Sequence, residues 1–125
     1  MQIKESAENY LERILMLKNQ NGTVRSIDIA HAMNFTKASV SVAMKNFRQE
    51  GYIRMEEDGE IMLTEKGLKV AERIYERHQV IALALMALGV EEKTAYEDSC
   101  KIEHDISDES FLKLKAHVLR YQEKN

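Results

Sequence analysis

Hydrophobic positions recur at helical spacing near the start of the chain. From Ser6 to Asn19, apolar residues fall at intervals of three and four, which predicts an amphipathic helix with Ser6 as its N-cap. The polar residues left off this stripe are expected to face solvent: Glu8, Asn9, Glu12 and Arg13. Asn21-Gly22 is then expected to end the helix and turn the chain.

Two shorter periodic stretches follow. Ser26 is expected to cap a helix over 27–33, and Thr36 a second helix that runs to about Glu50. The tight connection at Asn34-Phe35 and the small Ala30 predict a helix-turn-helix. The inward-facing residues are expected to be Ile29, Ala30, Met33, Val40, Met44 and Phe47.

Two short apolar runs, 52–55 and 61–64, flank an Asp58-Gly59 turn and predict a β-hairpin. A helix-turn-helix followed by a hairpin is a winged helix. Further helices are predicted over 65–88 and 91–103, with a last helix opening at Ser107. The predicted fold is mainly α with a small β-hairpin wing, and we place a winged-helix domain at 1–70 and a helical domain at 71–125.

Residues 80–90 are apolar almost all round, more than one small domain needs to bury. This indicates a subunit interface, so we expect a homodimer. Apolar stripes at helical spacing are also typical of an ordinary core.

Composition narrows the classes of function. The chain has 125 residues, a net charge of -3 and a single cysteine. The acidic balance means that contact with nucleic acid needs a local basic patch. One cysteine excludes an intramolecular disulfide and favours a reducing cytoplasm. We find no secretory signal, and the longest apolar run, 80–88, is too short to span a bilayer.

The local basic patch lies in the second helix of the helix-turn-helix. Residues 36–48 include three basic residues and no acidic one. Lysine and arginine suit phosphate contacts, whereas short polar side chains reach base edges. The ordinary alternative is a solvated helix face, but the agreement of helices, turn and hairpin favours binding of double-stranded DNA. The residues expected to contact it are Thr36, Lys37, Ser39, Ser41, Lys45, Asn46 and Arg48. A dimer would place two such helices about 34 Å apart, the spacing of a palindromic operator.

A second chemical group gathers at Cys100, Glu103 and His104. At i, i+3 and i+4 these residues share one face of a helix, while Ile102 points elsewhere to pack. Thiolate, imidazole and carboxylate together suit Fe²⁺, Zn²⁺ or Co²⁺ better than Mg²⁺ or Ca²⁺. The alternative is a buried structural cysteine beside a solvated Glu-His pair.

Taken with the winged helix, residues 97–108 (Glu-Asp-Ser-Cys-Lys-Ile-Glu-His-Asp-Ile-Ser-Asp) resemble the metal-binding segment of the diphtheria-toxin-repressor family of metal-dependent repressors. The resemblance covers nearly all of the chain and extends to 10–14, 28–30, 63–67 and Arg77-His78. It implies a dimeric repressor in which a divalent metal acts as corepressor, and a two-domain form like the shorter, manganese-sensing branch.

The resemblance also implies a ligand set. Glu12 and His78 match ligands of the manganese-sensing branch, Glu103 and His104 match both branches, and Cys100 matches the iron-sensing branch. Asn9 takes a position where the branches carry Asp or Met, and its amide would donate at most a carbonyl oxygen. Ala82 and Tyr96 replace the ligands of the iron-sensing branch's ancillary site, so we expect that site to be missing.

One thiolate favours Fe²⁺ over the harder Mn²⁺, with Zn²⁺ or Co²⁺ as substitutes in vitro. We therefore expect an Fe²⁺-dependent repressor of metal-homeostasis genes, with Mn²⁺ as the runner-up, and neither a small-molecule substrate nor a membrane partner. The alternatives are a regulator that responds to an organic ligand or to oxidation of Cys100, a constitutive DNA binder with a degenerate metal site, and an enzyme with Cys100 as nucleophile. The enzyme is disfavoured because the sequence has no glycine-rich oxyanion or phosphate loop.

Overall fold

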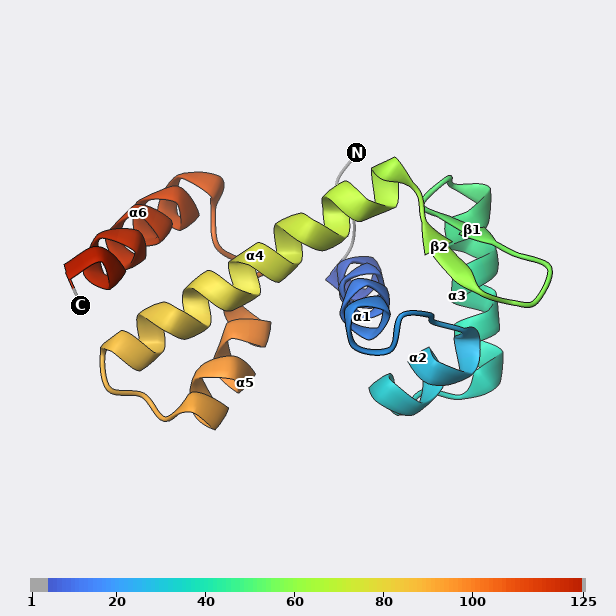
Figure 1. The fold of residues 1–125 in the computed structure, drawn as a ribbon, viewed down its shortest axis with the longest axis horizontal. Helices are drawn as coiled ribbons and strands as arrows, with labels where there is room; N and C mark the ends of the chain where they lie inside the picture. The colour runs from blue at the N-terminus through green and yellow to red at the C-terminus, as the bar shows by residue number, and fades with distance from the viewer. Residues whose placement is uncertain (1–4, 125) are drawn as a thin grey trace. The chain divides into compact units, whose positions relative to one another are not determined.

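The computed structural model describes residues 5–124, in which six helices and one two-stranded hairpin form two compact units (Figure 1). Residues 1–72 belong to the first unit and residues 73–125 to the second. The elements are α1 (Glu5–Asn21), α2 (Ser26–Met33), α3 (Lys37–Gln49), β1 (Ile53–Met55), β2 (Ile61–Leu63), α4 (Glu65–Ala87), α5 (Glu92–Ile102) and α6 (Asp108–Lys124). The expected mainly helical fold with a hairpin wing is confirmed.

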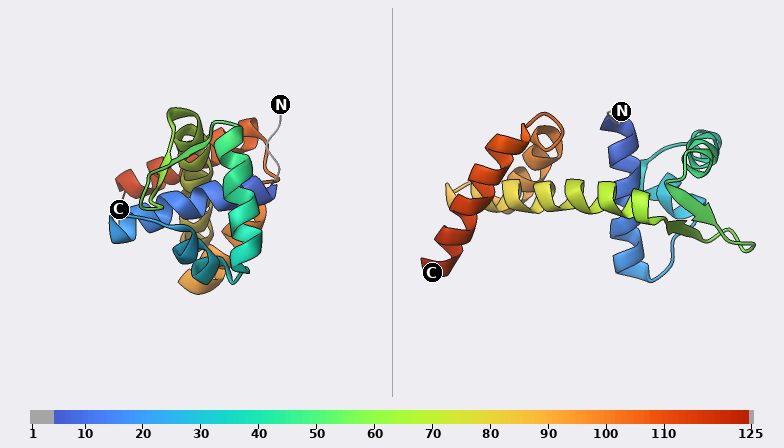
Figure 2. Two further views of the ribbon diagram at one scale, coloured as in Figure 1. Left: turned by 90° about the vertical axis from the view of Figure 1, so that its right-hand side faces the viewer. Right: turned by 90° about the horizontal axis from the view of Figure 1, so that it is seen from above.

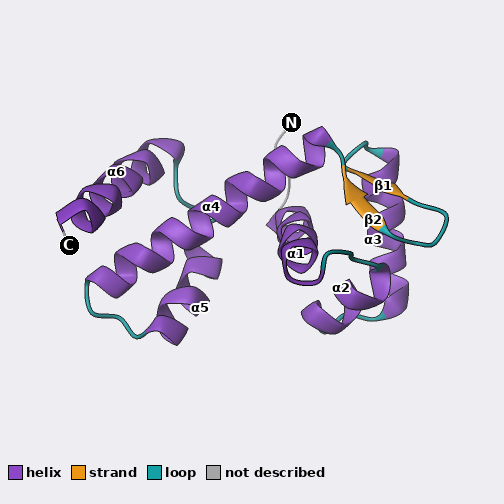
Figure 3. Ribbon diagram, viewed as in Figure 1, coloured by secondary structure: helices purple, strands orange, loops and turns teal. Residues whose placement is uncertain are grey.

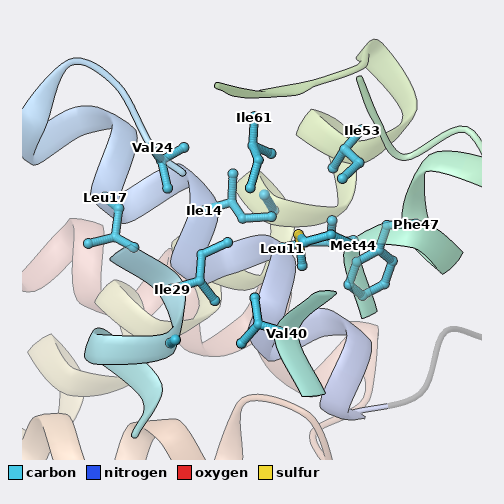
Figure 4. Close-up of a cluster of buried hydrophobic side chains, with 12 residues drawn as sticks. Leu11, Ile14, Leu17, Val24, Ile29, Val40, Met44, Phe47, Ile53 and Ile61 are labelled. Carbon is cyan, nitrogen blue, oxygen red and sulfur yellow. The ribbon is translucent and has the colours of Figure 1, made fainter. Parts of the chain in front are cut away.

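The first unit encloses one hydrophobic core, to which α1, α2, α3 and both strands contribute (Figure 4). Leu11 and Ile14 of α1 meet Ile29, Val40 and Met44 of the helix-turn-helix there, and Ile53 and Ile61 supply the hairpin side. The predicted inward-facing residues are buried except Met33, which is half-buried. The sequence prediction was wrong for Glu8 and Glu12. It placed both side chains in solvent, but both residues are buried.

The caps of the helix-turn-helix differ in part from those expected. Helix α2 already includes Ser26, and its cap is Arg25, whose backbone N–H donates to the Asp28 carboxylate at 2.9 Å. The Asp28 carboxylate, three residues after the cap, therefore supplies the capping side chain that was predicted to be the Ser26 hydroxyl. Thr36 caps α3 as predicted, since its Oγ1 accepts from the backbone N–H of Ser39 at 3.1 Å.

The wing is a short antiparallel pair whose turn extends away from α3 (Figure 2). Ile53 pairs with Leu63, and the backbone N–H of Ile61 donates to the Val24 carbonyl at 2.8 Å. Gly67, in the first turns of α4, passes so close to the hairpin that a side chain there would overlap the Tyr52 carbonyl. The wing is thus fixed to the segments before α2 and after β2.

In the second unit, α5 and α6 pack with the later part of α4. Ile74, Ile81, Ala95, Phe111 and Val118 are buried. Ser107 caps α6 as predicted, because its Oγ accepts from the Ser110 N–H at 3.1 Å. Leu88, Leu112 and Leu119 remain exposed. Among the described residues, no helix is long and apolar enough to cross a membrane.

Candidate metal centre and nucleic-acid interface

His78 on α4 is the centre of the polar cluster in the second unit. Its Nδ1 lies 2.9 Å from Glu103 Oε2, 2.9 Å from Ser99 Oγ and 3.5 Å from Cys100 Sγ. A carboxylate oxygen, a hydroxyl oxygen and a sulfur therefore lie against one imidazole nitrogen. They belong to the last turn of α5 and to its C-cap residue.

Glu103 and His104 follow directly after α5. Glu103 is the C-cap of this helix, and its side chain is fully buried. The His104 side chain is also buried, and its Nε2 lies 3.4 Å from Glu103 Oε1. Cys100 and Glu103 both lie against His78, as expected for one helix face, and Glu103 is the αR C-cap of α5. His104 lies beyond the end of this helix, which includes residues up to Ile102.

Two other details of this segment depart from expectation. Cys100 is exposed, which excludes the buried structural cysteine considered as its alternative role. Ile102 was expected to pack but is 38% exposed. At this end of α5 the side chains of Glu103 and His104 are buried, whereas Ile102 lies at the surface.

The electrostatics of the cluster favour a positive charge on it. The pKa of His78 is raised from 6.5 to about 10, first by its hydrogen bond with Cys100 and then by that with Glu103, while burial acts in the opposite direction. A carboxylate and a thiol beside an imidazole stabilise a proton there, and a divalent cation would satisfy the same atoms.

The donor types present around His78 are ones that bind divalent metals in proteins. Glu103 Oε1 is buried and accepts no hydrogen bond from the described residues of the second unit. A buried carboxylate oxygen without a donor is costly unless a cation neutralises it. The available donors are the imidazoles of His78 and His104, the Glu103 carboxylate and the Cys100 sulfur, a soft set that suits Fe²⁺ or Zn²⁺.

The remaining predicted ligands, Glu12 and Asn9, lie on α1 of the first unit, with Glu12 buried and Asn9 half-buried. At the positions of the ancillary site, Ala82 is buried, and the Tyr96 hydroxyl donates to Gln79 Oε1 at 3.3 Å. Neither Ala82 nor Tyr96 offers a strong ligand for a metal.

No sequence pattern indicated Ser99 or the role of Arg77. Ser99 is fully buried and contacts the same His78 nitrogen as Glu103. A single serine inside a helix is not part of any recognisable motif. Its position one turn before Glu103, however, places it on the same helix face as this carboxylate. Arg77 was recognised only as part of a motif, but its guanidinium is buried beside the cluster.

The expected DNA-contacting face lies on α3, and all seven predicted residues are exposed. Thr36 and Ser39 are also joined to each other, because the Thr36 hydroxyl donates to Ser39 Oγ at 2.9 Å. Val42, which the sequence analysis did not select, is 61% exposed among them. An exposed valine offers an apolar contact such as thymine methyl groups accept.

The acidic wing is partly neutralised within the first unit. Arg25 Nη2 lies 2.9 Å from Asp58 Oδ2, and Lys18 Nζ lies 3.4 Å from Glu60 Oε1. The Glu60 N–H, and then the Arg25 guanidinium, hold the pKa of the Asp58 carboxyl below its usual value. These ion pairs engage two basic side chains outside α3, whereas Lys37, Lys45 and Arg48 of α3 are exposed.

The described residues thus combine a winged helix-turn-helix, whose second helix is basic and exposed, with a helical unit in which imidazole, carboxylate and thiol side chains lie together. This combination is typical of a metal-dependent DNA-binding regulator. Residues 2–61 match the family model described as the N-terminal DNA-binding domain of iron-dependent repressors. Residues 64–124 match the model described as their metal-binding and dimerisation domain.

The chain therefore belongs to the iron-dependent, or diphtheria-toxin, repressor family of transcriptional repressors, which are not enzymes. It is 36% identical over 98% of its length to the HTH-type transcriptional regulator MJ0568 of Methanocaldococcus jannaschii, of which it covers 99%. It is 32% identical over 96% of its length to the HTH-type transcriptional regulator MntR of Lysinibacillus sphaericus, of which it covers 86%.

Solved structures show the same fold. The crystal structure of T. acidophilum IdeR matches 94% of the chain with a TM-score of 0.80 at 23% identity. The manganese regulator SloR matches 94% with a TM-score of 0.76 at 25% identity. The chain spans about half the length of these two proteins, 55% and 54% respectively.

Proposed function

We propose that this protein is an Fe²⁺-responsive repressor that binds a palindromic DNA operator as a homodimer. The observation that carries the proposal is the convergence of Cys100, Glu103 and Ser99 on His78 Nδ1, with His104 buried alongside. His78, Cys100, Glu103 and His104 would hold the ion. When bound, the ion would supply the positive charge beside the Glu103 carboxylate in place of the His78 proton.

The choice of Fe²⁺ rests on Cys100. A thiolate ligand favours Fe²⁺ and Zn²⁺ over Mn²⁺, which prefers oxygen ligands. Mn²⁺ remains the second candidate because the manganese regulator SloR shares the fold and one relative is named MntR. We further propose Glu12 as a ligand from the DNA-binding unit, by its match to the family, with Asn9 as a weaker donor.

Calorimetric titration without oxygen tests the choice of metal. We expect Fe²⁺ to bind more tightly than Mn²⁺, and Cys100→Ser to narrow or reverse this difference because it replaces a soft donor by a hard one. Tighter binding of Mn²⁺ by the unmodified protein would refute the assignment of Fe²⁺. Glu12→Gln tests the ligand from α1, with the exposed Glu109→Gln as a matched control.

The proposed interaction with DNA uses the exposed face of α3. Lys37, Lys45 and Arg48 would contact phosphates, while Ser41 and Asn46 would reach base edges. Thr36 and Ser39 would position the start of the helix. The proposed dimer is supported by the exposed apolar residues of the second unit, Leu88, Leu112 and Leu119. Sedimentation equilibrium is expected to give twice the monomer mass.

The exposure of Cys100 supports a second candidate signal, oxidation of the thiol. A thiol beside an imidazole is available to peroxide, which would convert it to a sulfenic acid. Glu103→Ala separates the two proposals because it spares the thiol. Loss of the DNA-binding response in this variant supports metal sensing, whereas a retained peroxide response supports the thiol switch.

A further inference from the structure

Arg77 lies next to His78 on α4 and is 3% exposed. Its Nη1 donates to the Glu103 carbonyl at 3.2 Å and to the Ile106 carbonyl at 2.7 Å, and its Nη2 pairs with Asp108. The guanidinium carbon also lies 5.2 Å from the centre of the Phe111 ring. One side chain thus contacts the end of α5, its connection to α6 (teal in Figure 3) and the start of α6.

The Glu103 carbonyl belongs to the peptide group that joins Glu103 to His104. A change in ψ of Glu103 or in φ of His104 that the other angle does not compensate would reorient the His104 side chain relative to that of Glu103. Carbonyls at the end of a helix lack their regular amide partner and need another donor. Arg77 supplies that donor, which fixes the peptide with the two side chains 3.4 Å apart.

The cost of burying Arg77 indicates that this contact is specific. A buried guanidinium is desolvated, and Asp108, the carboxylate that pairs with it, is largely exposed. Hydrogen bonds from Nη1 to two carbonyls offset part of that cost, and the simultaneous pairing of Nη2 with Asp108 uses the planar fork of arginine. A general packing role would be met by an apolar side chain at lower cost.

We propose that Arg77 is a positioning residue of the metal centre, which holds the Glu103–His104 peptide in the orientation that the ligands require. Two adjacent residues of α4 would then act on the same turn: His78 as a ligand and Arg77 through the backbone. This inference rests on the proposed function, because it assigns Arg77 a part in the binding of metal by that site.

The test is anaerobic titration of the full chain with Co²⁺, whose visible and near-ultraviolet bands report ligand geometry and thiolate coordination. We expect Arg77→Gln to weaken Co²⁺ binding by about 10- to 100-fold, the usual effect of losing a group that orients a ligand, and to alter the visible bands. Arg73→Gln is the matched control, because Arg73 also pairs with Asp108, at 3.2 Å, one turn earlier on the same helix. It should leave affinity and bands unchanged.

Arg77→Lys keeps the charge but not the fork, so we expect it to bind Co²⁺ more weakly than the unmodified protein and more tightly than Arg77→Gln. This variant also serves as the test if Arg77→Gln does not fold. Arginine variants that lose stability in urea while retaining the Co²⁺ affinity and bands of the control would overturn the inference. Failure of the unmodified protein to bind Co²⁺ would instead refute the proposed metal site, which is a separate result.

Discussion

The charge on His78 gives a prediction whose size follows from the structure. Its pKa of about 10 in the metal-free protein compares with 6.5 for an ordinary histidine, so the imidazole stays protonated through neutral pH. Raising the pH through about 10 should remove this proton from the folded chain. Because the folded pKa lies above the unfolded one, the stabilisation is complete below pH 6.5 and is lost as the pH rises through about 10.

The expected loss of unfolding free energy has an upper bound, and solvent screening reduces it below that bound. Each pKa unit corresponds to ~1.4 kcal/mol, so the full shift would amount to about 5 kcal/mol. Cys100, the largest contributor to the shift, is exposed, and solvent screens its interaction with His78. We therefore expect the free energy of unfolding to fall by about 2 kcal/mol across this range.

Two assays measure the effect in the metal-free protein. The imidazole signals in NMR spectra, assigned to His78 by their loss in His78→Gln, should titrate near pH 10. Urea unfolding should show that the unmodified protein loses stability relative to His78→Gln as the pH rises. The comparison of the two proteins cancels the contributions of the other titrating groups, because both proteins share them. A His78 midpoint at or below 6.5, with parallel stability curves for the two proteins, would refute the reasoning.

Three further predictions concern the first unit. Gly67→Ala should destabilise it by roughly 1–3 kcal/mol in urea unfolding, because the new methyl group overlaps the Tyr52 carbonyl, and an unchanged midpoint would contradict this packing. Thr36→Ala should cost about 1 kcal/mol through loss of the α3 cap, with Thr36→Ser restoring most of it. Lys45→Gln should weaken DNA binding and reduce the salt-dependence slope by about one, whereas Lys113→Gln on α6 should not change that slope.

Much of the fold was predictable because its local signals agree with one another. The period of the apolar residues located α1, α3 and α4, and Asp58-Gly59 located the turn of the wing. The cap of α2 was misplaced because Ser26 and Asp28 both offer capping groups, and sequence alone does not show which one the backbone uses. Glu8 and Glu12 were expected in solvent because polarity alone does not reveal burial.

The candidate metal centre was predictable in its residue types but not in its geometry. The spacing of Cys100, Glu103 and His104 suggested one helix face, and Cys100 and Glu103 do lie together against His78. His104 lies beyond the end of α5, with its Nε2 3.4 Å from Glu103 Oε1. Ser99 and Arg77 act through contacts 21 and 26 residues away in the chain, to His78 and Glu103 respectively. No local pattern indicates such contacts.

Binding of the purified protein to its own upstream DNA, followed by fluorescence anisotropy without oxygen, distinguishes a metal-dependent repressor from a constitutive DNA-binding protein. We expect weak binding with chelator and binding on the order of tenfold tighter, or more, with Fe²⁺, a response that Glu103→Gln should lose. Mn²⁺ should be less effective than Fe²⁺. Equally tight binding with chelator and with metal would contradict the account and leave a constitutive DNA-binding protein.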